Sequence, residues 1–310
     1  MIIRYQKLNF LLEAIDTLGL PDYKGSTFRG GFGNVFKRVV CALKRSDCRD
    51  CLLKSRCVYA YIFETSPPEA TQVMGMNKYE KVPHPFVIEP PEEKQRIYEP
   101  AEKLGFGLIL IGRAVDYLPY FIYTFDELGK TGLGKGRGKY RLLSVKDHEK
   151  PIYSYEDKTI RTAPVSEQIL PDAFSFGSRL EEVSLSFLTP ARIVYQRELV
   201  SELDFHILLR SLLRRLCLLY YFHCESREPL WDHKLLISKT EEVITGESSL
   251  QWHDWERYSA RQGVRMKLGG VVGNITYKNV PDAFMPILRV GEILHVGKGT
   301  SFGLGKYEIG

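Results

Sequence analysis

Long apolar runs and a strong excess of one charge are both missing from this sequence. No stretch of the 310 residues reaches the length of a membrane-spanning helix, and the first residues follow a strand pattern instead of a signal-peptide pattern. We therefore expect a cytoplasmic protein without a membrane partner. The formal net charge of +5 permits a polyanionic partner but does not require one. A chain of this length is expected to form two domains.

Cysteine is scarce, but four of the six cysteines fall close together. They are Cys41, Cys48, Cys51 and Cys57. This spacing is typical of a metal site and not of a secreted disulfide framework. Four thiolates suit tetrahedral Zn²⁺, and such a site would be structural because protein ligands occupy every position. An iron–sulfur cluster is the weaker alternative, and four reduced thiols in a loop are the remaining one.

Two glycine-rich stretches of the chain repeat each other when the numbering is shifted by 167. Residues 129–140 then align with residues 296–307. The matching residues are Pro119, Gly132, Gly136, Gly138, Lys139 and Tyr140 in the first copy, and Pro286, Gly299, Gly303, Gly305, Lys306 and Tyr307 in the second. Internal repetition of this kind indicates two copies of one structural module, each with a glycine loop near its end.

The hydrophobic patterns predict the same order of elements in both copies. In the first copy we expect strands at 2–13, 85–90, 105–112 and up to 145, with helices at 25–43 and 118–128. In the second we expect strands at 183–188 and 306–309, a hairpin over 250–258 and 264–278, and helices at 203–223 and 284–295. The order βαββαβ is that of the ferredoxin-like split motif.

We therefore predict an α+β protein of two tandem ferredoxin-like domains. The first spans residues 1–150 and carries the four-cysteine metal knuckle as an insertion at 41–57. The second spans residues 183–310 and ends in the glycine-rich loop. Residues 151–182 are rich in proline and polar side chains without a clear period, which is typical of a linker or of an elaboration at the edge of a sheet.

Several motifs together resemble the RAMP proteins of CRISPR systems, and more narrowly the Cas6 family. They are LPDYKGSTFRGGFG at 20–33, the cysteine cluster at 41–57, VPHPFVIEPP at 82–91, GLGKGRGKY at 132–140, ELDFHILLRSLLRRL at 202–216, WERYSARQGVRMKLGG at 255–270 and LHVGKGTSFGLG at 294–305. The resemblance covers nearly the whole chain. It implies an endoribonuclease that cuts precursor CRISPR RNA within its repeats. Cleavage would be metal-independent, by attack of a 2′-hydroxyl, and would leave a 2′,3′-cyclic phosphate.

The partners that the resemblance implies are CRISPR repeat RNA and other Cas proteins of an effector complex. Two other functions stay open. One is a non-catalytic RAMP subunit that only holds guide RNA, and the other is a zinc-stabilised RNA-binding protein outside CRISPR systems. No cofactor is expected for the catalysis itself.

The glycine loops are the first candidates for contact with RNA, because backbone amides and nearby cations position phosphates. Their expected RNA-binding residues are Gly297, Gly299, Gly303, Gly305, Lys306, Arg137 and Lys139. Tight packing of helix against strand is the alternative explanation for the glycines. A second candidate is the predicted hairpin, with Arg257, Arg261 and Lys267 beside an aromatic residue. A solvated β-face explains that pattern about equally well.

Cleavage by a 2′-hydroxyl needs a base, an acid and positive charge beside the phosphorane. Related enzymes often carry a histidine or tyrosine on the first helix, but residues 25–43 contain neither, and Asn34 lies in that region. The catalytic candidates are therefore His84 at the entrance of a strand, His295 at the end of the last helix, and Lys298 in the glycine loop. The reserve candidates are Tyr23, Lys24 and Tyr258.

Overall fold

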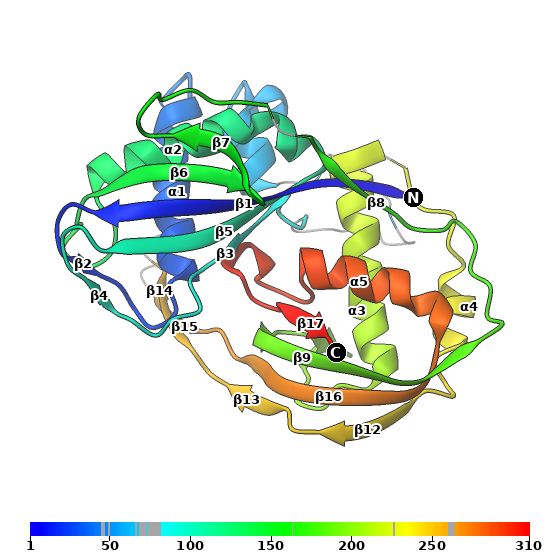
Figure 1. Cartoon of the computed structure of the whole chain (residues 1–310). Helices are drawn as coiled ribbons and strands as arrows, with labels where there is room; N and C mark the ends of the chain where they lie inside the picture. Colours follow the sequence, from blue (N-terminus) through cyan, green and yellow to red (C-terminus); the bar gives the residue numbers. More distant parts are fainter. Residues whose placement is uncertain are drawn as a thin grey trace. The chain divides into compact units, whose positions relative to one another are not determined.

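The computed structural model describes residues 1–44, 47–48, 50–65, 67, 73, 82–162, 164–225, 227–259 and 264–310, and for 256–259 and 264–267 only the backbone (Figure 1). The chain forms two compact units. We call residues 3–167 with 222–224 the N-terminal unit, and residues 1–2, 168–221 and 225–310 the C-terminal unit. None of the described helices is both long and apolar enough to span a membrane.

The N-terminal unit is an antiparallel sheet with two helices packed on it. The strands are β1 (Ile2–Ala14), β3 (Phe86–Glu89), β5 (Lys103–Ile111), β6 (Tyr140–Asp147) and β7 (Lys150–Ser154), and the helices are α1 (Gly25–Val40) and α2 (Leu118–Thr131). The order across the sheet is β3-β5-β1-β6-β7. A separate short pair joins β2 (Leu18–Gly19) to β4 (Ile97–Tyr98).

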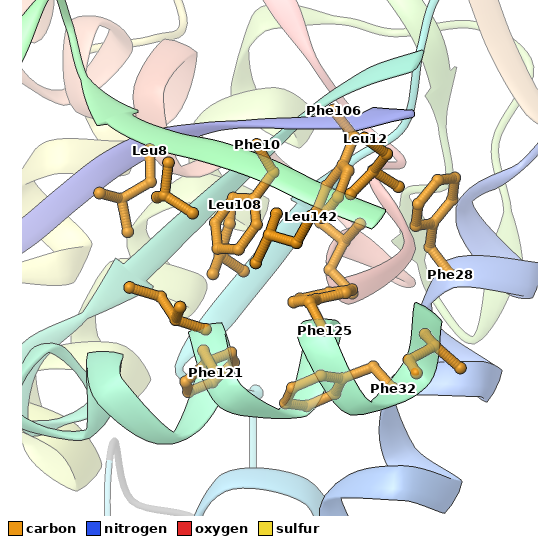
Figure 2. Close-up of a cluster of buried hydrophobic side chains, with 14 of the residues drawn as sticks. Leu8, Phe10, Leu12, Phe28, Phe32, Phe106, Leu108, Phe121, Phe125 and Leu142 are labelled. Carbon is orange, nitrogen blue, oxygen red and sulfur yellow. The ribbon is translucent and has the colours of Figure 1, made fainter. Parts of the chain in front are cut away.

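Aromatic side chains join the two helices of this unit to its sheet. The buried phenylalanines of α1 recur every fourth residue, which puts Phe28, Phe32 and Phe36 on one face. Phe32 stacks on Phe121 of α2 with ring centroids 4.8 Å apart. Phe106 of β5 contacts Phe125 of α2 at 4.8 Å. Figure 2 labels Phe28, Phe32, Phe106, Phe121 and Phe125 around α2 and the strands, and these residues belong to one core cluster.

The C-terminal unit repeats this architecture. Its main strands are β9 (Arg179–Ala191), β12 (Ile244–Ser248), β16 (Gly270–Pro281) and β17 (Tyr307–Ile309), and its helices are α3 (Phe205–Tyr220), α4 (His233–Ser238) and α5 (Met285–Leu294). The order across the sheet is β12-β16-β9-β17, with β13 (Gln251–His253) also paired to β16. Two hairpins stand apart, β10 (Val194–Tyr195) with β11 (Glu198–Leu199), and β14 (Glu256–Ser259) with β15 (Val264–Lys267).

The predicted α+β class and the βαββαβ order are confirmed in both units. The order β3-β5-β1-β6 in one sheet corresponds to β12-β16-β9-β17 in the other. The repeat extends to single hydrogen bonds. The carbonyl of Lys139 accepts from the amide of Ile15 at 2.9 Å, and the carbonyl of Lys306 accepts from the amide of Leu188 at 3.0 Å. Tyr140 and Tyr307 each donate a hydroxyl hydrogen bond to the carbonyl of a helix residue.

The range 151–182 is more structured than a plain linker. It contains most of β7, the strand β8 (Ser166–Ile169) and the first residues of β9. Trp231 also donates its indole N–H to the carbonyl of Pro171 at 2.9 Å. Polar, proline-rich segments of this kind lack a local period, so their strand pairing depends on distant partners that sequence patterns do not reveal.

Candidate functional site

The glycine loop of the C-terminal unit has a backbone that only glycine adopts without strain. The φ angles of Gly297, Gly299, Gly303 and Gly305 are +82°, +79°, +89° and +73°. At Gly305 the backbone also comes very close to a neighbour, because a Cβ there would lie 1.8 Å from the carbonyl oxygen of Val296. The Gly305 amide donates to the carbonyl of Pro190 at 3.0 Å. The loop is therefore tied to the end of β9 in one defined shape.

Replacing Gly305 with alanine is expected to destabilise this loop, and Gly136 provides the matched control. Gly136 has a similar φ of +88°, but a Cβ there would meet nothing within 4 Å. Gly136→Ala should therefore cost only the strain of the left-handed backbone, about 1–2 kcal/mol. Gly305→Ala adds the clash with Val296 and should lower the unfolding free energy further. Urea denaturation of both variants tests this, and equal losses would show that the close approach does not matter.

His295 is part of the core of this loop. Its side chain is only 1% exposed, and its Nδ1–H donates to the carbonyl of Leu304 at 3.1 Å. The buried guanidinium of Arg215 binds the end of α5. Its Nε donates to the carbonyl of His295 at 3.0 Å, and its Nη2 donates to the carbonyl of Leu294 at 2.7 Å. Burial lowers the pKa of Arg215 to about 9, which leaves the guanidinium charged at neutral pH. His295 thus holds the loop, while Lys298 on the same loop is exposed.

The first glycine loop and the hairpin carry the other expected cations. Arg137 and Lys139 are exposed on the loop between α2 and β6. On the hairpin, Arg257 of β14 pairs with Met266, and Lys267 of β15 pairs with Glu256. The side chains of these hairpin residues, and Arg261 as a whole, lie outside the described part of the structure.

His84 lies in the N-terminal unit, directly before β3, and is bound by Arg29 of α1. Nη2 of Arg29 is 2.6 Å from Nε2 of His84. A guanidinium can only donate, so Nε2 accepts and the proton of the neutral ring is on Nδ1. The ring of Phe63 supports both side chains, with the Arg29 Cζ atom 4.4 Å from its centroid. An anion that drew Arg29 away would release Nε2 to accept a proton.

Sequence reasoning missed Arg29. The sequence feature that could have identified Arg29 is its position one turn into the first helix, within the motif at 20–33. Related enzymes often carry a catalytic histidine or tyrosine on this helix. Of the reserve candidates, Lys24 is buried and donates from Nζ to the carbonyl of Glu93 at 2.8 Å. Burial raises the pKa of Tyr23, which keeps its phenol protonated. Both are therefore less suited than the His84–Arg29 pair to respond to a ligand.

The four cysteines do not form a metal centre in the described residues. No three His, Cys, Asp or Glu side chains come together there as a group that could hold an ion. Cys48 and Cys57 pack against the hydrophobic core, whereas Cys51 lines a cavity. As placed, these residues do not fit a four-thiolate site.

The zinc prediction from the sequence stays a prediction. Elemental analysis of protein purified in reducing buffer checks it directly, because a four-thiolate site would retain about one metal ion per chain. Cys51→Ser should then lower stability and leave the chemistry intact. Protein with neither zinc nor iron would leave four reduced thiols as the explanation.

Comparison with known proteins matches both halves of the chain to family models. Residues 3–165 match the model AF_1859_N, an N-terminal domain, and residues 185–307 match the model of the CRISPR-associated endoribonuclease Cas6. An uncharacterized protein of Archaeoglobus fulgidus is 27% identical over 296 residues, which cover 94% of this chain and 92% of that protein.

Solved Cas6 structures share the fold. A Cas6 product complex has a TM-score of 0.55 at 17% identity, with 98% of this chain and 99% of that chain covered. Thermus thermophilus Cas6 has a TM-score of 0.54 at 16% identity, with 99% and 98% covered. A chain of a partial Cas6-RT-Cas1–Cas2 complex has a TM-score of 0.56 at 15% identity, covering 99% of this chain and 46% of that one.

Proposed function

Because the chain belongs to the Cas6 family of RAMP proteins, and its N-terminal half to the AF_1859_N family, we propose that it cuts precursor CRISPR RNA within the repeats. The observation that carries this proposal is the match to the Cas6 model over residues 185–307, which includes the whole glycine loop. The rigid shape of that loop supports a role in positioning the RNA backbone. Repeat RNA is thus the proposed substrate, and other Cas proteins are proposed partners.

The proposed reaction is an intramolecular transesterification. A base takes the proton of the 2′-hydroxyl, the 2′-oxygen attacks the adjacent phosphorus, and the bond from phosphorus to the 5′-oxygen breaks. An acid returns a proton to that 5′-oxygen. The products are a 2′,3′-cyclic phosphate and a 5′-hydroxyl, so neither water nor a metal ion enters the balance.

We assign the roles from the chemistry that each side chain can perform. His84 is the proposed base, because the phosphate can draw Arg29 away from Nε2 and so release the acceptor. Arg29 would then balance the phosphorane charge. Lys298, exposed on the C-terminal glycine loop, is proposed to contact the RNA backbone. His295 is given a positioning role, because its buried ring is bonded to Leu304. Contacts with the RNA backbone are proposed for the glycines and cations of the two glycine loops and for Arg257, Arg261 and Lys267 of the hairpin.

Incubation of the protein with a repeat RNA in EDTA tests this function. The expected result is cleavage at one position, with a 5′ fragment that ends in a cyclic phosphate. Phosphatase treatment before and after mild acid distinguishes this end from a linear phosphate. Cleavage that stops in EDTA, or a fragment with a 3′-hydroxyl, would contradict the proposed mechanism.

A non-catalytic guide-holding subunit is the second candidate function. Two observations favour it: α1 carries neither histidine nor tyrosine, and His295 is occupied inside the loop. The same incubation separates the two functions, because such a subunit would bind repeat RNA tightly and leave it intact.

A further inference from the structure

The N-terminal unit contains a cavity of about 520 Å³ that the proposed chemistry does not use. Its volume lies in the range of pockets that bind small molecules or single nucleotides. Its walls come from residues 51–65, 67 and 82, from Arg113 before α2, and from Phe222 and His223. Lys54, Tyr61, Arg113 and His223 supply the polar groups that matter for a ligand.

One wall of the cavity is rigidly built around Tyr61 and His223. His223 is buried, and its Nε2–H donates to the carbonyl of Pro83 at 2.8 Å. Its Nδ1 is therefore the acceptor for the Tyr61 hydroxyl at 3.3 Å. Gly112 allows the close approach of this segment, because a Cβ there would lie 2.0 Å from the His223 carbonyl oxygen. Burial raises the pKa of Tyr61, so its phenol stays protonated.

The charge of the cavity favours an anionic ligand. Its described lining includes the cations Lys54 and Arg113 and no aspartate or glutamate. Arg113 is exposed at the rim, where Nη2 donates to the carbonyl of Phe222 at 3.2 Å. Its Cζ atom lies 5.0 Å from the ring centroid of Tyr61. The guanidinium is thus held in place with an aromatic face beside it, an arrangement that suits a phosphate next to a base.

Tyrosine rings continue from the cavity on to the surface of α2. The centroids of Tyr61 and Tyr117 are 5.9 Å apart, and those of Tyr117 and Tyr120 are 6.2 Å apart. Tyr120 is 44% exposed. The neighbouring Asp116 is paired with Arg4 at 3.4 Å, which reduces its repulsion of an anion. Tyr61 and Tyr117 are half-buried, and neighbouring rings of the row are tilted against each other by 51° and 54°. Aromatic side chains beside a cation are how proteins stack the bases of a single strand.

We propose that this cavity and tyrosine row bind a single-stranded segment of RNA. One nucleotide would enter the cavity, with its phosphate at Arg113 and Lys54, and the following bases would stack on Tyr117 and Tyr120. None of the described residues that line the cavity belongs to a glycine loop or to the His84–Arg29 pair, and the RNA held there would be a segment that is not being cut. The choice of RNA as ligand rests on the proposed function. A protein partner is less favoured because aromatic rings beside Lys54 and Arg113, with no acidic side chain among the described lining residues, match a polyanion with flat bases.

The double variant Arg113→Ala/Tyr120→Ala tests the site, with Arg141→Ala/Tyr155→Ala as matched control. The control pair is an arginine and an exposed tyrosine of the same unit, with the Arg141 Cζ atom 4.7 Å from the Tyr155 ring centroid, and neither residue lines the cavity. The probe is a fluorescent ten-nucleotide oligouridylate, whose binding needs no cleavage. Affinity should fall about tenfold or more in the first variant, since one lost stacking contact is worth roughly that much, and stay unchanged in the control.

Photocrosslinking gives a second readout that does not depend on affinity. With 4-thiouridine in the oligonucleotide, crosslinked peptides should contain Tyr61, Tyr117 or Tyr120. Equal affinity of both double variants, or crosslinks confined to other segments, would overturn the proposal and leave a protein partner for this surface. Loss of binding in a protein that never cuts repeat RNA would uphold this site and reject the proposed enzyme.

Discussion

Replacement of His84 by alanine should lower the single-turnover rate of repeat-RNA cleavage by about 10²–10⁴-fold, as loss of a proton-transfer group typically does. Affinity for the RNA should remain close to that of the unaltered protein, because Arg29 and not His84 makes the proposed contact with the phosphate. Arg29→Ala should also slow cleavage, since it removes charge from the phosphorane. Arg29→Lys should restore part of the rate, because a lysine keeps the charge but not the fork of donors.

His148→Ala is the control for this experiment. His148 is in the same unit, and its side chain is 85% exposed beside Asp147. The His148→Ala variant should cut repeat RNA at the rate of the unaltered protein. Quenched-flow or manual time courses with enzyme in excess measure the rates, and gel shifts measure the affinities. Wild-type cleavage by His84→Ala would reject His84 as the base and direct attention to Tyr23, Lys24 and Tyr258.

Replacement of Arg215 by methionine should lower the unfolding free energy of the C-terminal unit by about 2–6 kcal/mol. The guanidinium satisfies the carbonyls of Leu294 and His295 at the end of α5. Methionine fills similar space but cannot donate to either carbonyl, and a buried acceptor that loses its donor costs about 1–3 kcal/mol. The exposed cation Arg210 of the same helix is the control, and Arg210→Met should change stability by no more than about 0.5 kcal/mol.

Tryptophan fluorescence in urea suits this measurement. All three tryptophans, Trp231, Trp252 and Trp255, lie in the C-terminal unit, so the signal reports on that unit. The midpoint should shift in Arg215→Met and stay in place in Arg210→Met. The loop that follows α5 should lose its shape as well, so the RNA affinity of Arg215→Met should fall. Equal midpoints would mean that water replaces the guanidinium at these carbonyls.

Local patterns were enough to predict much of the fold. The four-residue spacing of Phe28, Phe32 and Phe36 predicts α1, because such spacing places side chains on one helix face. The aligned glycines predict two related loops, and Gly132 and Gly299 do share a positive φ. These properties depend on neighbours a few residues apart, which a sequence displays directly. The same alignment predicts that each glycine loop lies near the end of its module.

The sequence by itself thus determined the class, the two modules and the glycine loops, whereas the tertiary structure decided which side chains meet. Arg29 and His84 are 55 residues apart in the chain, yet one hydrogen bond joins them. His295 resembled a proton-transfer group by its place beside the loop, but contacts from Arg215 and Leu304 bury it. Periodicity and backbone preference act locally, whereas burial and hydrogen bonding of a side chain depend on residues that only folding brings into contact.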